Sequence, residues 1–134
     1  MNESILIIED EVEFASMVQL RLTLDGYRCD VAHHTLQGVR ALLSRRHDLL
    51  VLDLMVPGGG GISVLKEREK HGLTDLPVII ITGQTLTPGL KAELNQYGVA
   101  AILNKPYDPA QFARIINQCF DQAEQGVIYE SVAG

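Results

Sequence analysis

Four acidic residues and one lysine carry the side chains of this chain that could act together chemically. The acidic residues are Glu9, Asp10, Glu11 and Asp53, and the lysine is Lys105. Each comes at or close to the end of a short apolar run typical of a buried strand. Because the carboxyl ends of parallel strands meet at one edge of a sheet, these residues would gather there. Clustered carboxylates repel one another unless a cation compensates their charge. The pattern therefore predicts a site that holds a divalent metal and handles a phosphoryl group.

Strand and helix patterns alternate along the chain and must position these residues. The expected strands are 4–8, 27–31, 48–53, 76–82 and 100–103. The expected helices are 12–24, one with Thr35 as N-cap, 62–70, one opened by Thr87 and Pro88, and one opened by Asp108 and Pro109. Five βα units of this regularity predict an α/β fold with a doubly wound, five-stranded parallel sheet and five helices.

Length and composition indicate one globular domain, expected to span residues 1–125. The 134 residues are 46% hydrophobic and contain no apolar stretch of the length that spans a membrane. Residues 126–134 carry no periodic signal and are expected to be a tail or the start of a linker. The N-terminus lacks the pattern of a signal peptide, so a cytoplasmic location is expected.

The charge and the remaining reactive side chains exclude other classes of site. A net charge of -6 argues against direct nucleic-acid binding by this domain. Cys29 and Cys119 are expected to be buried free thiols, since a reducing compartment disfavours a disulfide, and they show no metal-ligand spacing. The four histidines, including His47, are expected to be solvated surface residues.

Four short motifs, each at the end of an expected strand, occur in a characteristic order. They are Ile7-Ile8-Glu9-Asp10-Glu11, Asp53-Leu54-Met55-Val56-Pro57-Gly58, Ile81-Thr82-Gly83 and Asn104-Lys105-Pro106-Tyr107. Together they resemble the receiver domain of two-component response regulators, and the resemblance covers residues 4–123. It implies the flavodoxin-like strand order 2-1-3-4-5.

The resemblance assigns a phosphoacceptor and a metal site. Asp53 is the expected phosphoacceptor, since a carboxylate can attack phosphorus to give an aspartyl phosphate. Mg²⁺ is the expected cofactor, bound by Asp10, Asp53 and the backbone carbonyl of Met55, and through a water by Glu9. The family more often has aspartate at the position of Glu9. We assign Glu11 to the surface near the helix start, where negative charge is favourable.

Three further positions carry over from the family. Lys105 is expected to pair with Asp53 at rest and with a phosphoryl oxygen afterwards, and the Lys105–Pro106 peptide bond is expected to be cis. The hydroxyl of Thr82 is expected to bind the phosphoryl group. Thr82 and Ile102 are the expected switch residues. Three residues before Lys105, where this chain has Ile102, the family usually has an aromatic residue whose side-chain rotation accompanies phosphorylation.

The resemblance implies a signalling phosphoacceptor, with self-catalysed phosphotransfer and autodephosphorylation, rather than an enzyme of metabolism. The expected partners are a sensor histidine kinase or phosphotransfer protein, and an output domain or effector protein. A homodimer is a further option, and no association with a membrane is expected. The readout is expected on the surface of the fourth helix, fifth strand and fifth helix. Its expected residues are Leu86, Leu90, Ile102, Tyr107 and Gln111.

Three alternatives stay open. A receiver fold that binds partners without phosphorylation is the runner-up. A metal-dependent phosphohydrolase would benefit from an aspartate two positions after Asp53, where this chain has Met55. A flavin or cobalamin module is the third alternative, and cobalamin binding would favour a histidine at that same position.

Overall fold

Strands and helices alternate through the part of the chain that the structure, a computed structural model, describes, which is residues 2–125. The strands are β1 (Ser4–Ile8), β2 (Arg28–Ala32), β3 (Leu49–Leu52), β4 (Val78–Thr82) and β5 (Ala101–Asn104). The helices are α1 (Val12–Leu24), α2 (Thr35–Leu43), α3 (Gly60–Lys70), α4 (Pro88–Gln96) and α5 (Pro109–Gln125). The expected tail or linker, residues 126–134, lies outside the described residues.

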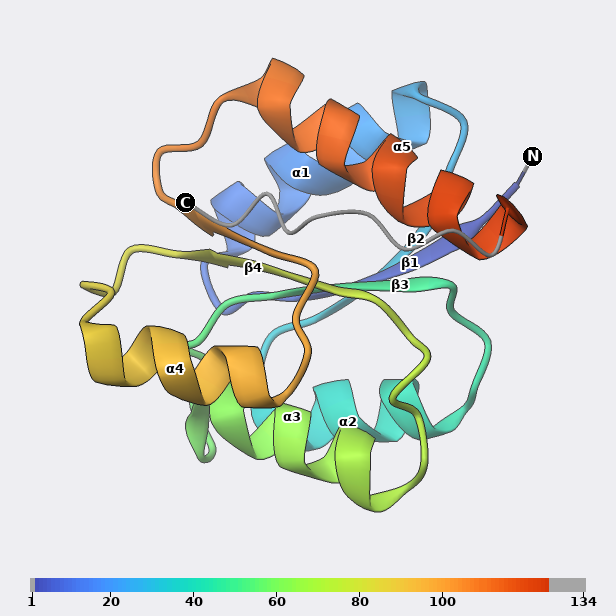
Figure 1. The fold of residues 1–134 in the computed structure, drawn as a ribbon. Helices are drawn as coiled ribbons and strands as arrows, with labels where there is room; N and C mark the ends of the chain where they lie inside the picture. Colours follow the sequence, from blue (N-terminus) through green and yellow to red (C-terminus); the bar gives the residue numbers. More distant parts are fainter. Residues whose placement is uncertain (1, 126–134) are drawn as a thin grey trace.

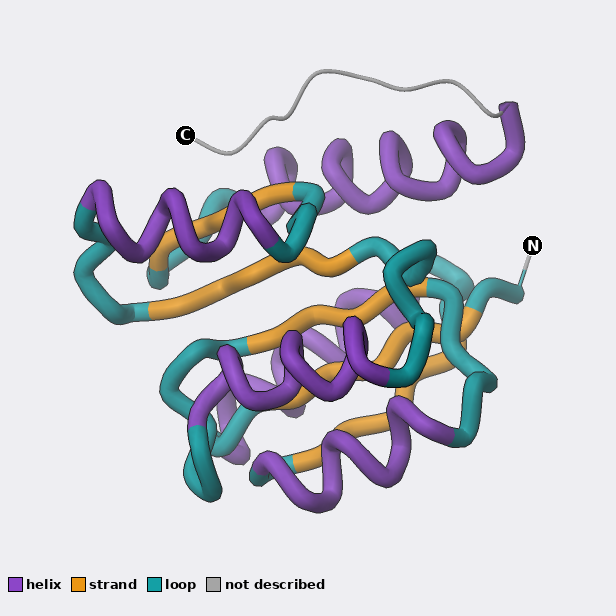
Figure 2. Tube along the Cα trace, turned by 60° about the horizontal axis from the view of Figure 1, so that its bottom comes forward, coloured by secondary structure: helices purple, strands orange, loops and turns teal. Residues whose placement is uncertain are grey.

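The five strands form one parallel sheet in the order β2-β1-β3-β4-β5. Helices α1 and α5 cover one face, and α2, α3 and α4 cover the other (Figure 1). The turned view in Figure 2 shows the same strands lying side by side between the helices. The expected fold class and strand order are therefore confirmed.

The central strands read as continuous apolar runs because both of their faces are covered. All residues of β3 and β4 are buried, and β1 is buried from Ile5 to Ile8. Strand β2 lies at an edge of the sheet and alternates between exposed and more buried positions until Ala32. This contrast explains why the apolar pattern of β2 is weaker than that of the central strands.

Helix α3 starts at Gly60 rather than at residue 62, and the N-cap of α2 also differs from the expected residue. His34, rather than Thr35, is the N-cap of α2, with extended backbone and an Nδ1 atom that accepts a hydrogen bond from the Gln37 N–H. Thr35 is already helical and buried, and its N–H donates to the carbonyl of Pro57. The expected N-cap of α4 is confirmed, since the Thr87 hydroxyl accepts from the Leu90 N–H.

A run of glycines fixes the path of the chain between β3 and α3. Gly58, Gly59 and Gly60 have φ values of 94°, 122° and 80°, which glycine adopts without the strain that a side chain would cause. Gly61 is required for a different reason. A Cβ atom there would lie 2.8 Å from the carbonyl oxygen of Asp53. The segment can therefore fold back closely against the end of β3.

Candidate phosphoacceptor site

The carboxyl edge of the sheet brings together the acidic residues and the lysine that the sequence singled out. Asp53 directly follows β3, Glu9 and Asp10 follow β1, and Lys105 follows β5. One carboxylate oxygen from each of Glu9, Asp10 and Asp53 lies within 4.8 Å of the others. Glu9 and Asp53 are buried, whereas Asp10 is exposed. The arrangement places an open acidic cluster over a buried carboxylate.

Both oxygens of Asp53 accept hydrogen bonds. Oδ1 accepts from the backbone N–H of Met55 at 3.0 Å, and Oδ2 accepts from Nζ of Lys105 at 3.0 Å. Asp53 is only 4% exposed, so these donors replace water around most of its carboxylate. The side chain is held in one orientation, with a cation on one of its oxygens.

Lys105 neutralises part of the negative charge. Its Nζ lies 2.9 Å from Oε1 of Glu9 as well as 3.0 Å from Oδ2 of Asp53. Burial acts to lower the pKa of Lys105, but hydrogen bonds to Glu11, Glu9 and Asp53 outweigh it and leave this pKa above its ordinary value. The ammonium group is therefore a permanent positive charge of the site.

Glu9 is the buried carboxylate of the cluster whose pKa is clearly shifted. Burial raises the pKa of Glu9 to about 7, against the opposing effect of hydrogen bonds from Lys105 and from the Glu11 N–H. The nearby charge of Asp53 acts in the same direction as burial. A cation close to Glu9 would remove the cost of this buried charge.

The N-cap of α1, Glu11, and a residue of its first turn, Phe14, complete the surroundings of Lys105, and the sequence alone places neither of them there. Oε1 of Glu11 lies 2.6 Å from Nζ of Lys105. The same Nζ lies 4.3 Å from the centroid of the Phe14 ring. From the sequence, Glu11 is assigned only to the surface near the start of the helix. The closeness of both residues to Asp10 along the chain was the available signal, since residues at the start of α1 lie beside the end of β1.

Thr82 ends β4, the strand beside β3, at the same edge of the sheet as the site. Thr82 is fully buried, and its hydroxyl accepts a hydrogen bond from the Gln84 N–H at 3.1 Å. The carbonyl of Thr82 accepts from the N–H of Lys105 at 2.9 Å. The Lys105–Pro106 peptide bond is cis. Thr82 and Lys105 are thus joined through the backbone, and within the described part of the chain the Thr82 hydroxyl makes no hydrogen bond to Asp53.

The expected readout residues divide between the two faces of the sheet. Ile102 is 5% exposed and packs in the cluster that Leu86 and Leu90 contact, on the side of α4. Tyr107 packs on the opposite side, with its ring edge-on to Phe14. Ile102 therefore belongs to the core, which corrects its assignment to a surface. The reason is that β5 is covered by helices on both of its faces.

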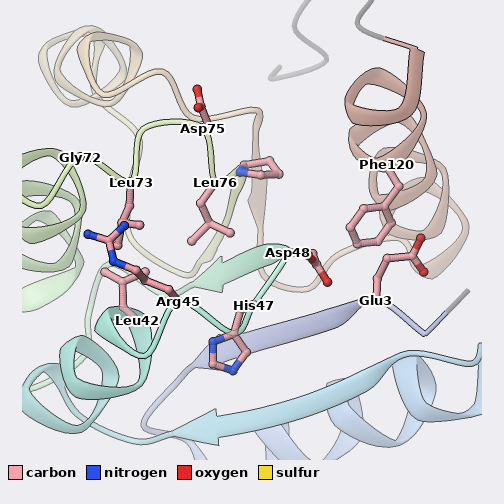
Figure 3. A pocket seen from close by; sticks show the side chains of 11 residues that line it. Glu3, Leu42, Arg45, His47, Asp48, Gly72, Leu73, Asp75, Leu76 and Phe120 are labelled. Atoms are coloured by element: carbon pink, nitrogen blue, oxygen red, sulfur yellow. The ribbon is translucent and has the colours of Figure 1, made fainter.

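A separate hollow of about 600 Å³ lies at the opposite edge of the sheet (Figure 3). It is lined by four apolar side chains, Leu42, Leu73, Leu76 and Phe120, and by Glu3, Arg45, His47, Asp48, Gly72, Asp75 and Pro77. The hollow lies where β1, β3 and β4 begin, whereas the acidic cluster lies where the strands end, so the two sites are separate.

His47 was expected to be a solvated surface residue, and the structure corrects this, because only 2% of its side chain is exposed. It pairs with Asp30 at 2.7 Å rather than with solvent.

Comparison with known proteins agrees with this geometry. The sequence model of one protein family, the response regulator receiver domain, matches residues 5–117 of this chain. The chain is 30% identical to the phosphate regulon transcriptional regulatory protein PhoB of Pseudomonas aeruginosa, over 83% of this chain and 48% of that protein. It is 37% identical to the response regulator ArlR of Staphylococcus epidermidis, over 78% of this chain and 47% of that protein. The chain thus spans about half the length of these curated relatives.

Solved structures show the same fold. A CheY-like response regulator receiver domain protein from Methanospirillum hungatei superposes with a TM-score of 0.86 at 20% identity, covering 95% of this chain and 100% of that one. The response regulator TrrA of Thermotoga maritima, solved in complex with Mg²⁺ and BeF, gives a TM-score of 0.75 at 21% identity, covering 87% and 98%. The chain belongs to the family of receiver domains of two-component response regulators.

In the described part of the chain, no helix has both the length and the apolar character that crossing a membrane requires.

Proposed function

We propose that this chain accepts a phosphoryl group on Asp53 from the phosphohistidine of a partner kinase or phosphotransfer protein, in a reaction that requires Mg²⁺. One observation carries the proposal. The buried Asp53 has one oxygen on Lys105 and lies within reach of the same small ion as Glu9 and Asp10. Phosphoryl transfer depends mainly on positioning and charge neutralisation, and this cluster offers both.

The residues present fit a magnesium ion. Their ligand atoms are carboxylate oxygens, which this hard cation prefers, and the exposed position of Asp10 leaves room for bound waters. Asp10, Asp53 and the carbonyl of Met55 would hold the ion directly, and Glu9 would hold it through a water. When bound, the ion supplies positive charge that offsets the charge of the transferring group.

The protein's own residues then carry out the transfer. A carboxylate oxygen of Asp53 attacks phosphorus, so that a P–O bond forms as the P–N bond of the donor breaks and the imidazole leaves with the electron pair. Lys105 exchanges the Asp53 oxygen for a phosphoryl oxygen. Water later releases inorganic phosphate and restores the carboxylate, which accounts for the expected autodephosphorylation.

The proposed switch begins at Thr82. To donate to the phosphoryl group, its hydroxyl turns toward Asp53 and gives up the hydrogen bond from the Gln84 N–H. This movement draws in the loop that leads to α4. Leu86 and Leu90 follow because they contact the cluster containing Ile102, so we place the readout on α4 and β5 with the adjoining start of α5. An output domain or effector, or a second copy of the chain, would bind there.

A docking surface for the phosphodonor lies beside the site. The outer side of α1 exposes Val12, Met17, Leu20 and Leu24, although its inner side is buried. A mostly apolar hollow of about 230 Å³ continues this surface toward the loop after β5, between Met17 and Pro106. Apolar side chains exposed together mark a site of protein association. This surface supports a protein donor whose histidine reaches Asp53 over α1.

Phosphorylation with acetyl phosphate tests the proposal, with intact mass spectrometry as the readout. The wild-type chain should gain one phosphoryl group in Mg²⁺ and none in EDTA, and Asp53→Asn should gain none. Asp75→Asn is the matched control, because it makes the same chemical change at an exposed residue on the opposite edge of the sheet. Mg²⁺-dependent labelling of Asp53→Asn would overturn the assignment. A wild-type chain that binds partners but takes no label would favour the runner-up, a receiver fold that acts without phosphorylation.

A further inference from the structure

Lys105 contacts three carboxylates, and the third belongs to a residue outside the proposed phosphoacceptor and metal set. Nζ lies 2.6 Å from Oε1 of Glu11, compared with 2.9 Å for Glu9 and 3.0 Å for Asp53. Glu11 therefore makes the shortest ionic contact of this lysine. It does so from the rim of the site, since 63% of its side chain is exposed.

The side chain of Glu11 does not serve its own helix. Glu11 is the N-cap residue of α1, yet it makes no side-chain capping hydrogen bond. Its N–H donates to Oε2 of Glu9 at 3.0 Å, and its carboxylate reaches across to Lys105. One turn later, the ring of Phe14 lies under the same ammonium group. The start of α1 thus supplies both an anion and an aromatic face to Lys105.

We propose that Glu11 is a positioning residue that holds Lys105 before phosphorylation and sets the balance between cation and anion binding at Asp53. The inference rests on the proposed function. Glu11 adds a negative charge to a site that already contains Glu9, Asp10 and Asp53, and this charge favours Mg²⁺. The same charge repels a phosphoryl group, and its carboxylate competes with that group for Lys105. Removing the charge of Glu11 should therefore change the two affinities in opposite directions.

The experiment compares Glu11→Gln with Glu13→Gln. Both variants remove one negative charge from an exposed residue near the start of α1, but Glu11 is the one of these two that contacts Lys105 in the described part of the chain. Binding of Mg²⁺ is followed by ¹H–¹⁵N NMR. Binding of beryllofluoride, which stands in for the phosphoryl group, is followed by ¹⁹F NMR at saturating Mg²⁺. Glu11→Gln should weaken Mg²⁺ binding about two- to fivefold and tighten beryllofluoride binding about as much, as expected for one partly screened charge. Glu13→Gln should change each by less than about 1.5-fold.

A third variant separates contact from charge. Glu11→Asp keeps the charge but shortens the side chain, so it should retain Mg²⁺ affinity while beryllofluoride binds more tightly. Equal effects of Glu11→Gln and Glu13→Gln would overturn the inference, as would a loss of both affinities in Glu11→Gln, which is the result of a merely structural role. A wild-type chain that binds neither ligand would instead overturn the proposed function, and this inference with it.

Discussion

The guanidinium of Arg68 donates from Nη1 to the carbonyl oxygen of Tyr97 at 2.8 Å, which joins α3 to the end of α4. Its other nitrogens donate to the carbonyls of Leu76 and Thr74, at 3.0 and 2.9 Å. Arg68 is 2% exposed, and its guanidinium donates these three hydrogen bonds to backbone oxygens rather than to a carboxylate. One buried side chain thus satisfies carbonyl groups in the connections that precede β4 and β5.

Replacing Arg68 with methionine should therefore destabilise the fold. The variant keeps an apolar stem but leaves three carbonyl oxygens without their donor, and a buried group left unsatisfied costs about 1–3 kcal/mol. We expect the free energy of unfolding to fall by at least about 2 kcal/mol in urea denaturation. Arg40→Met is the control, because Arg40 is exposed on α2. Equal stabilities of the two variants would contradict the role given to Arg68.

Two glycine-to-alanine substitutions should have opposite effects. In Gly61→Ala the new Cβ would lie 2.8 Å from backbone atoms of Asp53 and Leu54, which cannot move without disturbing the phosphoacceptor. We expect a loss of more than about 1 kcal/mol in unfolding free energy together with weaker Mg²⁺ binding. Gly89→Ala, in helix α4, meets nothing within 4 Å and should gain about 0.5–1 kcal/mol. Urea unfolding measures both, and a stabilised Gly61→Ala would disprove the close approach.

Magnesium should stabilise the folded chain through the acidic cluster. A ligand that binds only the native state adds RT ln(1 + [L]/Kd), about 2.7 kcal/mol at a concentration one hundred times Kd. We expect Tm to rise with Mg²⁺ concentration in the wild type. The rise should be lost in Asp10→Asn, whose exposed side chain contributes to the metal cluster. Asp25→Asn, on the exposed side of the α1 end, should keep the response.

The site was more predictable from the sequence than its surroundings were. Glu9, Asp53 and Lys105 could be brought together because each follows a strand, and parallel strands end at one edge of the sheet. The contact between Glu11 and Lys105 depends on side-chain directions at the start of α1, about which strand order says nothing. Arg68 could not be placed either, since its position on a helix does not show that three carbonyl groups converge on it.

The two cysteines should differ sharply in reactivity. Burial raises the pKa of the Cys119 thiol to about 11, so at pH 8 only about one molecule in a thousand carries the thiolate there. Cys119 is also 5% exposed, whereas Cys29 is half-buried on the edge strand β2, and its pKa is raised mainly by burial as well. With Ellman's reagent at pH 8, we expect Cys29→Ser to be nearly silent while folded and to release one equivalent of thiol in denaturant. Cys119→Ser should react while folded. Rapid labelling of folded Cys29→Ser would show that α5 opens away from the sheet, because Cys119 lies with Ile115 and Ile116 on the buried face of that helix.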